Sequence, residues 1–552
     1  MAGIVLATAF PSSAFGQAEL RGEWVGSLRS RAETLYVRLN LAGGGGDNLS
    51  ASVLSSQPRQ LKVAAARAVD STLTLTLVGG RDTFDLRGTW AGDTVTGSMT
   101  VRQSAGTFTL LPMAQVNPAL YDEYAGGYEL GPGRMVFVRR GDRLASKAPF
   151  DVERSWLQFV ESTGRTRLLF PSSQSEFFAG SAYTLPAPVT LRVKFVRDGS
   201  GRVTGMHWRE ENDAVEVHAP RTSRYRAEEV RFASGDVSLA GRLLIPAGPG
   251  PHPGVVLIPG GPGPSNRNDN YFAVADLLSA AGFATLTFEK RGTGASMGDW
   301  RRASYGDLAG DAVAAVQFLR RRPDLDAGCV GLWGISESGW IAPLAARTSS
   351  DVAFVAVVGA SGLPHAELDL ALLGRALRAE GAPDSVALRA IALERSIVEY
   401  ARTRRNWRNT RATLDTIRAA SWGHHSVIGT HTGYDFPVSE DHWFWRLYGA
   451  DAGYDPLPAL RELRVPLLAV WGEFDPRAPP DLNVPSFERA RAGRSDSAFR
   501  LVVVPRGDHV LWEFSTANTS SFHLVRRFVP EYFDLLRTWF TEQAASCARK
   551  TR

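Results

Sequence analysis

The chain reads Gly334-Ile335-Ser336-Glu337-Ser338-Gly339 between an apolar run, Cys329–Trp333, and a second apolar segment, Trp340–Ala346. This order predicts a strand, a sharp turn and a helix, with a serine at the turn. A nucleophile elbow of this kind holds its serine in a strained backbone conformation, so the residues two positions before and two positions after it must be small. For Ser336 these residues are a glycine and a serine. The stretch therefore predicts that Ser336 is a nucleophile.

Two other interpretations of the same stretch compete with this one. Ser338 as the nucleophile fails the size requirement, because Trp340 would then stand two positions after it. A Gly/Ser-rich connection without chemistry stays open on this stretch alone, since a short motif match carries a false-positive risk and Ser338 replaces the second glycine of the motif. The residues that a serine nucleophile needs elsewhere in the chain distinguish these interpretations.

A serine hydroxyl is a weak nucleophile until a general base takes its proton, and a carboxylate must hold that base in one tautomer. Two apolar runs downstream, Val465–Trp471 and Ala498–Val504, predict buried strands. The first is followed by Asp475 and the second by His509. The order serine, acid, histidine, with each residue placed after a strand, predicts a catalytic triad of Ser336, Asp475 and His509.

Both downstream members of this triad have rivals. Glu473 is the main alternative acid, and Asp508 is a weaker one. His509 combines a strand end, a nearby glycine and the right chain order, and we interpret the other histidines as structural or solvated ones. These other histidines are His207, His218, His252, His365, His424, His425, His431, His442 and His523.

Acyl transfer also needs two backbone N–H groups that hold the oxyanion of a tetrahedral intermediate. The N–H of Glu337, directly after the nucleophile, is one candidate. A Gly-rich loop after the apolar run Gly254–Ile258 supplies the other, with Gly260 and Gly261 permitting a close approach. A phosphate-binding loop is the alternative, but the spacing matches neither common phosphate-loop motif and two prolines remove donors.

Residues from about 226 to 545 resemble the α/β-hydrolase superfamily, in particular bacterial carboxylesterases related to the dienelactone-hydrolase and prolyl-oligopeptidase branches. The stretches that carry the resemblance are Val255–Pro264, Leu286–Ser296, the serine turn, Trp471–Asp475 and Gly507–His509. The second of these is structural in the family and is given no chemical role. The departures are Ser338 in place of a glycine and Pro259 where many relatives carry a histidine. The resemblance implies a serine hydrolase, for which we expect no cofactor and no metal.

Within this region, buried apolar runs of strand length alternate with helical patterns such as Phe522–Phe540. The alternation predicts an α/β fold, a mostly parallel sheet with helices on both faces. It stops over about 361–458, which predicts a helical lid inserted where the substrate enters. Trp443, Phe444 and Trp445 are candidate substrate-binding residues there, because consecutive side chains cannot all face one core. Packing inside the lid is the alternative.

The first 225 residues have a different pattern. Short alternating stretches such as Leu35–Leu39 and Thr72–Leu77 are separated by Gly, Asp and Ser turns, which predicts antiparallel β structure. We expect two β-rich domains, at 19–118 and 119–225, ahead of the catalytic domain at 226–545. Neither β-rich domain carries a candidate active-site residue.

The 552 residues carry a formal net charge of +5 from scattered arginines, which argues against a nucleic-acid partner. No apolar span has the length of a transmembrane helix, so stable membrane insertion is not expected. Residues 1–18 resemble a secretory signal that lacks its positive leader, which predicts a periplasmic or secreted location. Cys329 lies in a predicted strand and Cys547 in the C-terminal tail, and we expect neither a disulfide framework nor a metal site from them.

Together these features predict an exported serine hydrolase that cleaves small carboxylic esters through an acyl-enzyme on Ser336. An exopeptidase or amidase of the prolyl-oligopeptidase type is the nearest alternative, although no repeat of propeller blades is visible. A non-catalytic binding protein on the same fold is the third possibility, and the presence of all three triad candidates argues against it.

Overall fold

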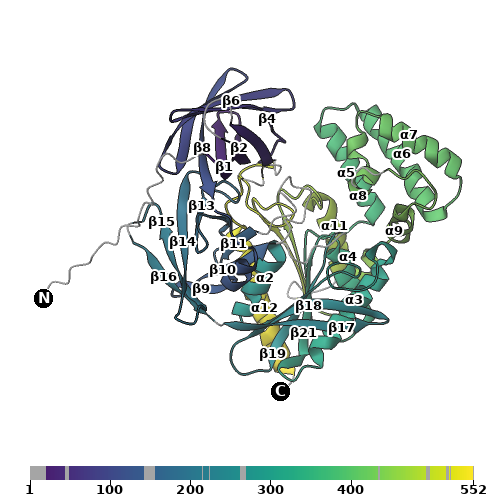
Figure 1. The fold of residues 1–552 in the computed structure, drawn as a ribbon. Helices are drawn as coiled ribbons and strands as arrows, with labels where there is room; N and C mark the ends of the chain where they lie inside the picture. Colours follow the sequence, from purple (N-terminus) through teal and green to yellow (C-terminus); the bar gives the residue numbers. More distant parts are fainter. Residues whose placement is uncertain are drawn as a thin grey trace. The chain divides into compact units, whose positions relative to one another are not determined.

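The computed structural model describes residues 20–43, 49–141, 156–213, 215–222, 224–261, 269–432, 436–492, 498–517, 521 and 524–550. The predicted secretory segment at 1–18 and His523 lie outside these residues. The chain, coloured along its length in Figure 1, divides into two compact units. The first comprises Met1–Phe159, Thr166–Arg221 and Ser520–Arg526, and the second comprises Val160–Arg165, Thr222–Thr519 and Arg527–Arg552.

The first unit begins with an antiparallel sheet of order β3-β2-β1-β8-β7-β6-β5-β4. Its strands are β1 (Gly22–Ser30), β2 (Thr34–Ala42), β3 (Ser50–Gln57), β4 (Lys62–Val69), β5 (Thr72–Gly79), β6 (Asp82–Ala91), β7 (Thr94–Val101) and β8 (Ser104–Met113). In β5 the leucines at 73, 75 and 77 are buried in one apolar core, and the threonines between them are more exposed. The alternation of the sequence thus matches the two faces of the sheet.

A short helix, α1 (Ala119–Tyr124), leads into a closed barrel of order β10-β11-β12-β13-β14-β15-β16-β9. Its strands are β9 (Gly126–Gly131), β10 (Arg134–Gly141), β11 (Trp156–Glu161), β12 (Thr166–Pro171), β13 (Glu176–Gly180), β14 (Val189–Arg197), β15 (Val203–Glu210) and β16 (Val217–Thr222). Aromatic rings fill the core of the barrel. Tyr124 stacks on Phe195 with ring centroids 4.2 Å apart, and Phe177 meets both rings edge-on.

The second unit is built on a sheet of order β17-β18-β20-β19-β21-β22-β23-β24. Its strands are β17 (Tyr225–Ser234), β18 (Val237–Pro246), β19 (His252–Ile258), β20 (Ala284–Phe288), β21 (Leu325–Ile335), β22 (Val355–Val358), β23 (Leu467–Gly472) and β24 (Phe499–Val504). The first two strands pair antiparallel, and the strands from β20 to β24 pair parallel. Because parallel strands end at one edge, the loops after them meet there.

Helices cover both faces of this sheet. One apolar core takes in α3 (Tyr305–Arg320), α4 (Ser338–Thr348), α10 (Leu457–Glu462) and α11 (Pro480–Arg491), and the other takes in α2 (Asp269–Ala280) and α12 (Pro530–Lys550). Along β19, Val256 and Ile258 enter the first core, whereas Val255 and Leu257 enter the second. Burial on both faces explains why the strand reads as a continuous apolar run. The predicted α/β-hydrolase fold with an antiparallel β-rich N-terminal region is confirmed.

A helical insertion separates β22 from β23 and is seen in Figure 1 as the group of green helices. It contains α5 (His365–Ala379), α6 (Asp384–Thr403), α7 (Trp407–Ala419), the 3-10 turn η2 (Gly423–His425), α8 (Val427–Thr432) and α9 (Trp443–Asp451). Another 3-10 turn, η1 (Trp300–Arg302), precedes α3 and packs on α9. The insertion has apolar cores of its own, distinct from the two beside the sheet.

One sequence expectation about the fold is wrong. Cys329 in β21 and Cys547 in α12 form a disulfide, with their Cα atoms 5.6 Å apart and 218 residues of sequence separation. The pairing was hidden because only the return of α12 onto the face of the sheet brings the two residues together. In the described part of the chain, every helix is too short or too polar to cross a membrane.

Candidate active site

Ser336 occupies the turn between β21 and α4 and has a φ of +60°. This left-handed conformation is unfavourable for a residue with a side chain and persists only where its surroundings enforce it. The serine N–H donates to the Val358 oxygen at 2.8 Å, and the serine carbonyl accepts from the Gly339 N–H at 2.8 Å. Two neighbouring elements, β22 and α4, therefore hold the turn in its strained form.

The small residues that flank the serine face each other across the turn. A Cβ on Gly334 would lie 2.3 Å from the Cβ of Ser338, a distance that no side chain could accept. The Ser338 side chain is buried, and its hydroxyl donates to the Ile258 oxygen at 2.9 Å. Ser338 thus fastens the elbow to the end of β19, which explains why the second motif glycine can be a serine here.

Asp475 and His509 lie together at the ends of β23 and β24. Nδ1 of His509 is 2.9 Å from both carboxylate oxygens of Asp475, whose Oδ1 also accepts from the N–H groups of Arg477 and Ala478 at 2.8 Å each. Burial alone would raise the pKa of Asp475, but the charge and hydrogen bonds of His509 and these two N–H groups outweigh it, and the pKa is lowered. The acid is therefore a carboxylate that keeps a proton on Nδ1 and leaves Nε2 of His509 to act as a base.

The peptide after β22 connects this pair to the serine. A Cβ on Gly359 would lie 2.8 Å from Nδ1 of His509 and 3.1 Å from Oδ2 of Asp475, so the pair rests directly on this glycine. Val358, the residue before it, accepts the hydrogen bond from the Ser336 N–H. Nε2 of His509 is buried and has no hydrogen-bond partner among the described residues. Catalytic hydrogen bonds commonly form only once substrate is bound.

The two alternative acids are engaged elsewhere. The exposed Glu473 accepts from the Arg506 N–H at 2.9 Å. Asp508 accepts from the N–H groups of Val510 and Trp512 at 3.0 and 2.8 Å and so shapes the turn that carries His509. Burial raises the pKa of Asp508 to about 6. The geometry therefore favours Asp475 as the partner of His509.

The candidate oxyanion residues lie where β19 ends beside the elbow. A Cβ on Gly260 would be 2.3 Å from the Ile335 oxygen, and Gly261 has a φ of +71°, so both positions require glycine. The loop residues at 262–268 lie outside the described residues. Glu337, whose N–H is the other candidate donor, is the N-cap residue of α4.

Lys290 joins the two sides of this candidate oxyanion site. Its ammonium donates to the Gly261 oxygen at 2.5 Å and forms an ion pair with the Glu337 carboxylate, and the Lys290 side chain is 3% exposed. Lys290 was not among the residues predicted from the sequence, because the turn after β20 resembles a turn that is structural in the family. A lysine is conspicuous there, since the chain contains only five lysines among 62 basic residues.

A second cluster, also missed from the sequence, joins the elbow helix to the insertion. Trp340 of α4 lies between Tyr305 and His365, at ring-centroid distances of 5.3 and 4.7 Å. The Tyr305 hydroxyl is 2.9 Å from Nδ1 of His365, and the Tyr305 N–H donates to Asp451 at 3.0 Å. Burial raises the pKa of Asp451 to about 7.

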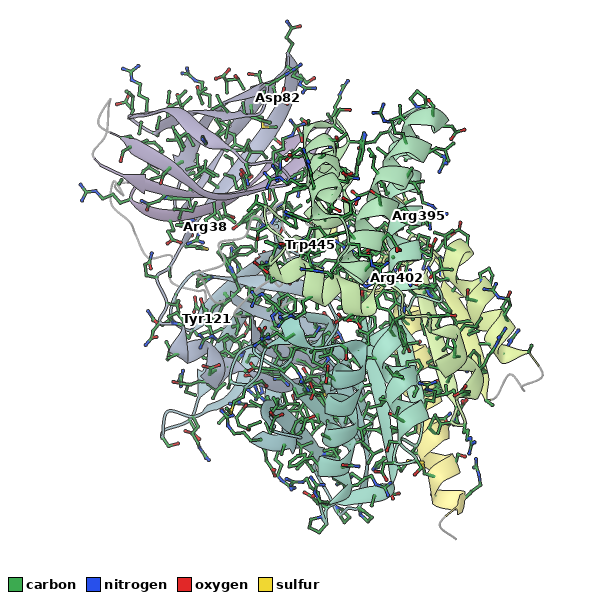
Figure 2. The ribbon with its side chains drawn as sticks, turned by 90° about the vertical axis from the view of Figure 1, so that its right-hand side faces the viewer. Arg38, Asp82, Tyr121, Arg395, Arg402 and Trp445 are labelled. Carbon is green, nitrogen blue, oxygen red and sulfur yellow. A yellow bond between two sulfur atoms is a disulfide. The ribbon has the colours of Figure 1, made fainter. Side chains whose placement is uncertain are left out.

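The three insertion aromatics do not share one role, which corrects the prediction for two of them. Phe444 and Trp445 are 0% and 1% exposed and pack with Tyr400 and Tyr448 in the core of the insertion. Trp445 is labelled among the insertion helices in Figure 2. The prediction assumed that α9 has one buried face, but other insertion helices pack around it, so neighbouring positions can both be buried.

Trp443 is the half-buried member of the three. Its ring meets Trp300 of η1 edge-on at 6.1 Å and lies under the Arg301 guanidinium at 5.7 Å. It helps to line a cavity of about 700 Å³ between η1, the end of α6 and α9. Trp445 also borders this cavity but is only 1% exposed, so Trp443 is the candidate of the three that is best placed to contact a ligand.

The comparisons with known proteins concern mainly the second unit. A family model described as X-Pro dipeptidyl-peptidase (S15 family) matches residues 223–509. No curated protein matches the chain significantly.

Among solved structures, 2,6-dihydroxy-pseudo-oxynicotine hydrolase is similar to this chain, with 18% sequence identity and a TM-score of 0.37. The match covers 58% of this chain and 69% of the hydrolase chain. Dienelactone hydrolase from Anabaena variabilis ATCC 29413 is similar with 19% sequence identity and a TM-score of 0.32, and the match covers 58% of this chain and 98% of the dienelactone hydrolase. Acetyl xylan esterase 1 from Thermoanaerobacterium sp. JW/SL YS485 is similar with 14% sequence identity and a TM-score of 0.34, and the match covers 64% of this chain and 87% of the esterase.

Proposed function

Since the chain belongs to the X-Pro dipeptidyl-peptidase (S15) family, we propose that it hydrolyses acyl substrates through a covalent acyl-enzyme on Ser336. The family match confirms the α/β-hydrolase serine hydrolase predicted from the sequence. The observation that carries the proposed mechanism is the buried Asp475–His509 pair, which rests on Gly359 directly beside the strained serine turn.

In the proposed reaction, Nε2 of His509 takes the hydroxyl proton as Oγ of Ser336 bonds to the carbonyl carbon of the substrate. The N–H groups of Glu337 and of the Gly260–Gly261 loop hold the oxyanion of the tetrahedral intermediate. His509 then gives its proton to the leaving group, and the acyl-enzyme forms. A water molecule, deprotonated by His509, attacks the acyl carbon, and Oγ leaves with the returned proton.

We propose small carboxylic esters as the substrates. A dipeptidyl-peptidase must bind the free ammonium group of its substrate, and a carboxylate near the nucleophile is the natural partner for it. The carboxylate nearest in sequence to the nucleophile, Glu337, is already paired with Lys290. The buried Asp451 accepts a backbone hydrogen bond and has its pKa raised to about 7 by burial, which weakens it as a partner for a cation. Both observations support an ester over a peptide substrate.

Release of dipeptides from X-Pro peptides is the second candidate function, and the family match favours it. The two candidates are separated by measuring kcat/KM for p-nitrophenyl esters of two to eight carbons and for aminoacyl-prolyl p-nitroanilides. A larger kcat/KM for the anilides would replace the ester proposal with the peptidase one.

The nucleophile is tested with a fluorophosphonate probe, which labels activated serines. Ser336→Ala should abolish labelling and lower kcat by about a million-fold, the usual loss for a triad serine. Ser338→Ala is the matched control, because it removes a neighbouring hydroxyl but leaves the two backbone hydrogen bonds of Ser336 that hold the turn, and it should keep most of both signals. Labelling that survives in Ser336→Ala contradicts the assignment.

We further propose that the helical insertion is a lid and that the protein is exported. Contact between Trp340, just behind the serine turn, and His365, at the start of α5, supports the lid. The Cys329–Cys547 disulfide supports export, because disulfides persist in oxidising compartments. N-terminal sequencing of periplasmic or secreted protein tests the export proposal, and recovery of uncleaved chain from the cytoplasm would contradict it.

A further inference from the structure

We propose that Glu380, His424 and His425 form a binding site for a divalent transition-metal ion, with Zn²⁺ as the ion that best suits these donors. The three residues belong to the helical insertion, and the proposal is independent of the proposed catalytic function. Their ligand atoms lie within 4.8 Å of one another. In the part of the chain that the structure describes, they are the one group of three His, Cys, Asp or Glu side chains that meets this limit.

The distances between the donors suit one shared ion. Nε2 of His425 lies 2.8 Å and Nε2 of His424 lies 3.8 Å from Oε1 of Glu380. Ligands held about 2.1 Å from a tetrahedral Zn²⁺ are about 3.4 Å apart, so the two histidine–glutamate distances lie within about 0.6 Å of the value that one ion requires. Two imidazoles and a carboxylate are a common Zn²⁺ ligand set, with water in the fourth position.

The ring of His424 is held in the tautomer that metal binding requires. Its Nδ1 lies 3.0 Å from the Ser421 carbonyl oxygen. Because a carbonyl oxygen can only accept, Nδ1 carries the proton and Nε2 presents a lone pair toward Glu380. A hydrogen bond from the second ring nitrogen to a backbone carbonyl is the usual support of a metal-binding histidine.

The environment of His425 provides a second, independent observation. Its Nε2 is buried, and despite the 2.8 Å contact with Glu380 it has no aligned hydrogen bond to any described group. A buried polar atom without such a bond is costly, and coordination to an ion would satisfy it.

Both sides of the site have a defined backbone. Glu380 is the C-cap residue of α5, where its N–H donates to the Ala376 oxygen, and the following Gly381 has a φ of +83° that ends the helix. In η2, the His425 N–H donates to the Trp422 oxygen at 2.8 Å. A bound ion would therefore link the end of α5 to η2 and reduce the motion of the insertion.

A simple ion pair between Glu380 and a protonated His425 is the competing explanation, and pH separates the two. An ion pair strengthens as pH falls through the histidine pKa, whereas metal affinity weakens because the ligand histidines must be neutral. Thiolate competitors do not complicate the measurement, because the two cysteines of the chain are joined in the disulfide.

The test is isothermal titration of the full, chelator-treated chain with ZnCl₂ at pH 7.5. We expect one saturable site per chain, a rise in melting temperature with Zn²⁺, and at least tenfold weaker binding at pH 5.5. Glu380→Gln and His425→Ala should each weaken binding at least tenfold and lose the Zn²⁺-dependent rise. Their melting temperatures without Zn²⁺ report whether they fold.

His207→Ala is the matched control, since Nδ1 of His207 contacts Glu216 at 2.9 Å in the first unit as a comparable histidine–glutamate pair. This variant should bind Zn²⁺ like the parent chain. Three outcomes would overturn the proposal: no saturable site in the parent, unchanged affinity in folded Glu380→Gln, or tighter binding at pH 5.5 than at pH 7.5.

Discussion

Replacing Lys290 by methionine should lower both kcat and the stability of the fold, and a second substitution at Glu337 should distinguish the two effects. The ammonium is buried, with 3% of the side chain exposed, and it holds the Gly261 carbonyl and the Glu337 carboxylate at the same time. Methionine keeps the length of the side chain and removes both contacts. The candidate N–H donors at Glu337 and Gly261 then lose the group that fixes their spacing.

The size of each effect follows from the exposure of the partners. Removing one partner of a buried ion pair lowers the free energy of unfolding by about 3–5 kcal/mol. Because the Glu337 side chain is 18% exposed, we expect a loss in the lower part of that range. Loss of one oxyanion donor lowers kcat by about a hundredfold to a thousandfold. Misplacement of a donor is milder than its removal, so we expect about a hundredfold. KM should change little, because the oxyanion exists only after attack.

The assay is the steady-state hydrolysis of the best p-nitrophenyl ester together with a melting curve. The double variant Lys290→Met/Glu337→Gln serves as the control, since it removes the unpaired carboxylate. It should recover most of the lost melting temperature and keep the lowered kcat. The reasoning is refuted if Lys290→Met keeps kcat within about threefold of the parent, or if the double variant restores kcat together with stability.

Three further predictions concern the acid, a buried carboxyl and the insertion core. Asp475→Asn should lower kcat by about three to four orders of magnitude, because the base loses its fixed tautomer, whereas Glu473→Gln should cost less than tenfold; the reverse ranking in ester turnover would move the role to Glu473. Burial raises the folded-state pKa of Asp451 to about 7. Between about pH 4 and pH 7 this carboxyl therefore binds more protons in the folded chain than in the unfolded chain. Its contribution to the free energy of unfolding falls as pH rises through this range. Asp451→Asn keeps an acceptor for the Tyr305 N–H but cannot titrate. The loss of unfolding free energy between pH 4 and pH 8 should therefore be smaller in this variant, by up to about 4 kcal/mol. Melting curves across that range test this, and an unchanged pH dependence would contradict it. Phe444→Ala should cost about 3–5 kcal/mol of stability and leave the preference for acyl-chain length unchanged, since its ring is wholly inside the insertion core; a changed preference with an unchanged melting temperature would return this residue to the substrate cleft.

Local physics was enough for the features that depend on neighbouring residues. The small residues around Ser336 predicted a strained turn, and the structure has a φ of +60° there. Apolar runs bounded by turn residues predicted the parallel strands, because strands buried on both faces need apolar side chains throughout. Asp475 and His509 could be nominated for the same reason, since each follows such a strand and parallel strands end at one edge.

The class of fold, the order of the candidate triad and the place of the insertion could therefore be predicted from the amino-acid sequence. Contacts between segments far apart in the chain could be identified only in the folded structure. Cys329 meets Cys547 because α12 returns to the sheet, Lys290 reaches Glu337 across the elbow, and Phe444 is buried because other helices pack around α9. The physical reason is that periodicity reports which face of an element is apolar, whereas partner choice depends on how the elements pack in three dimensions.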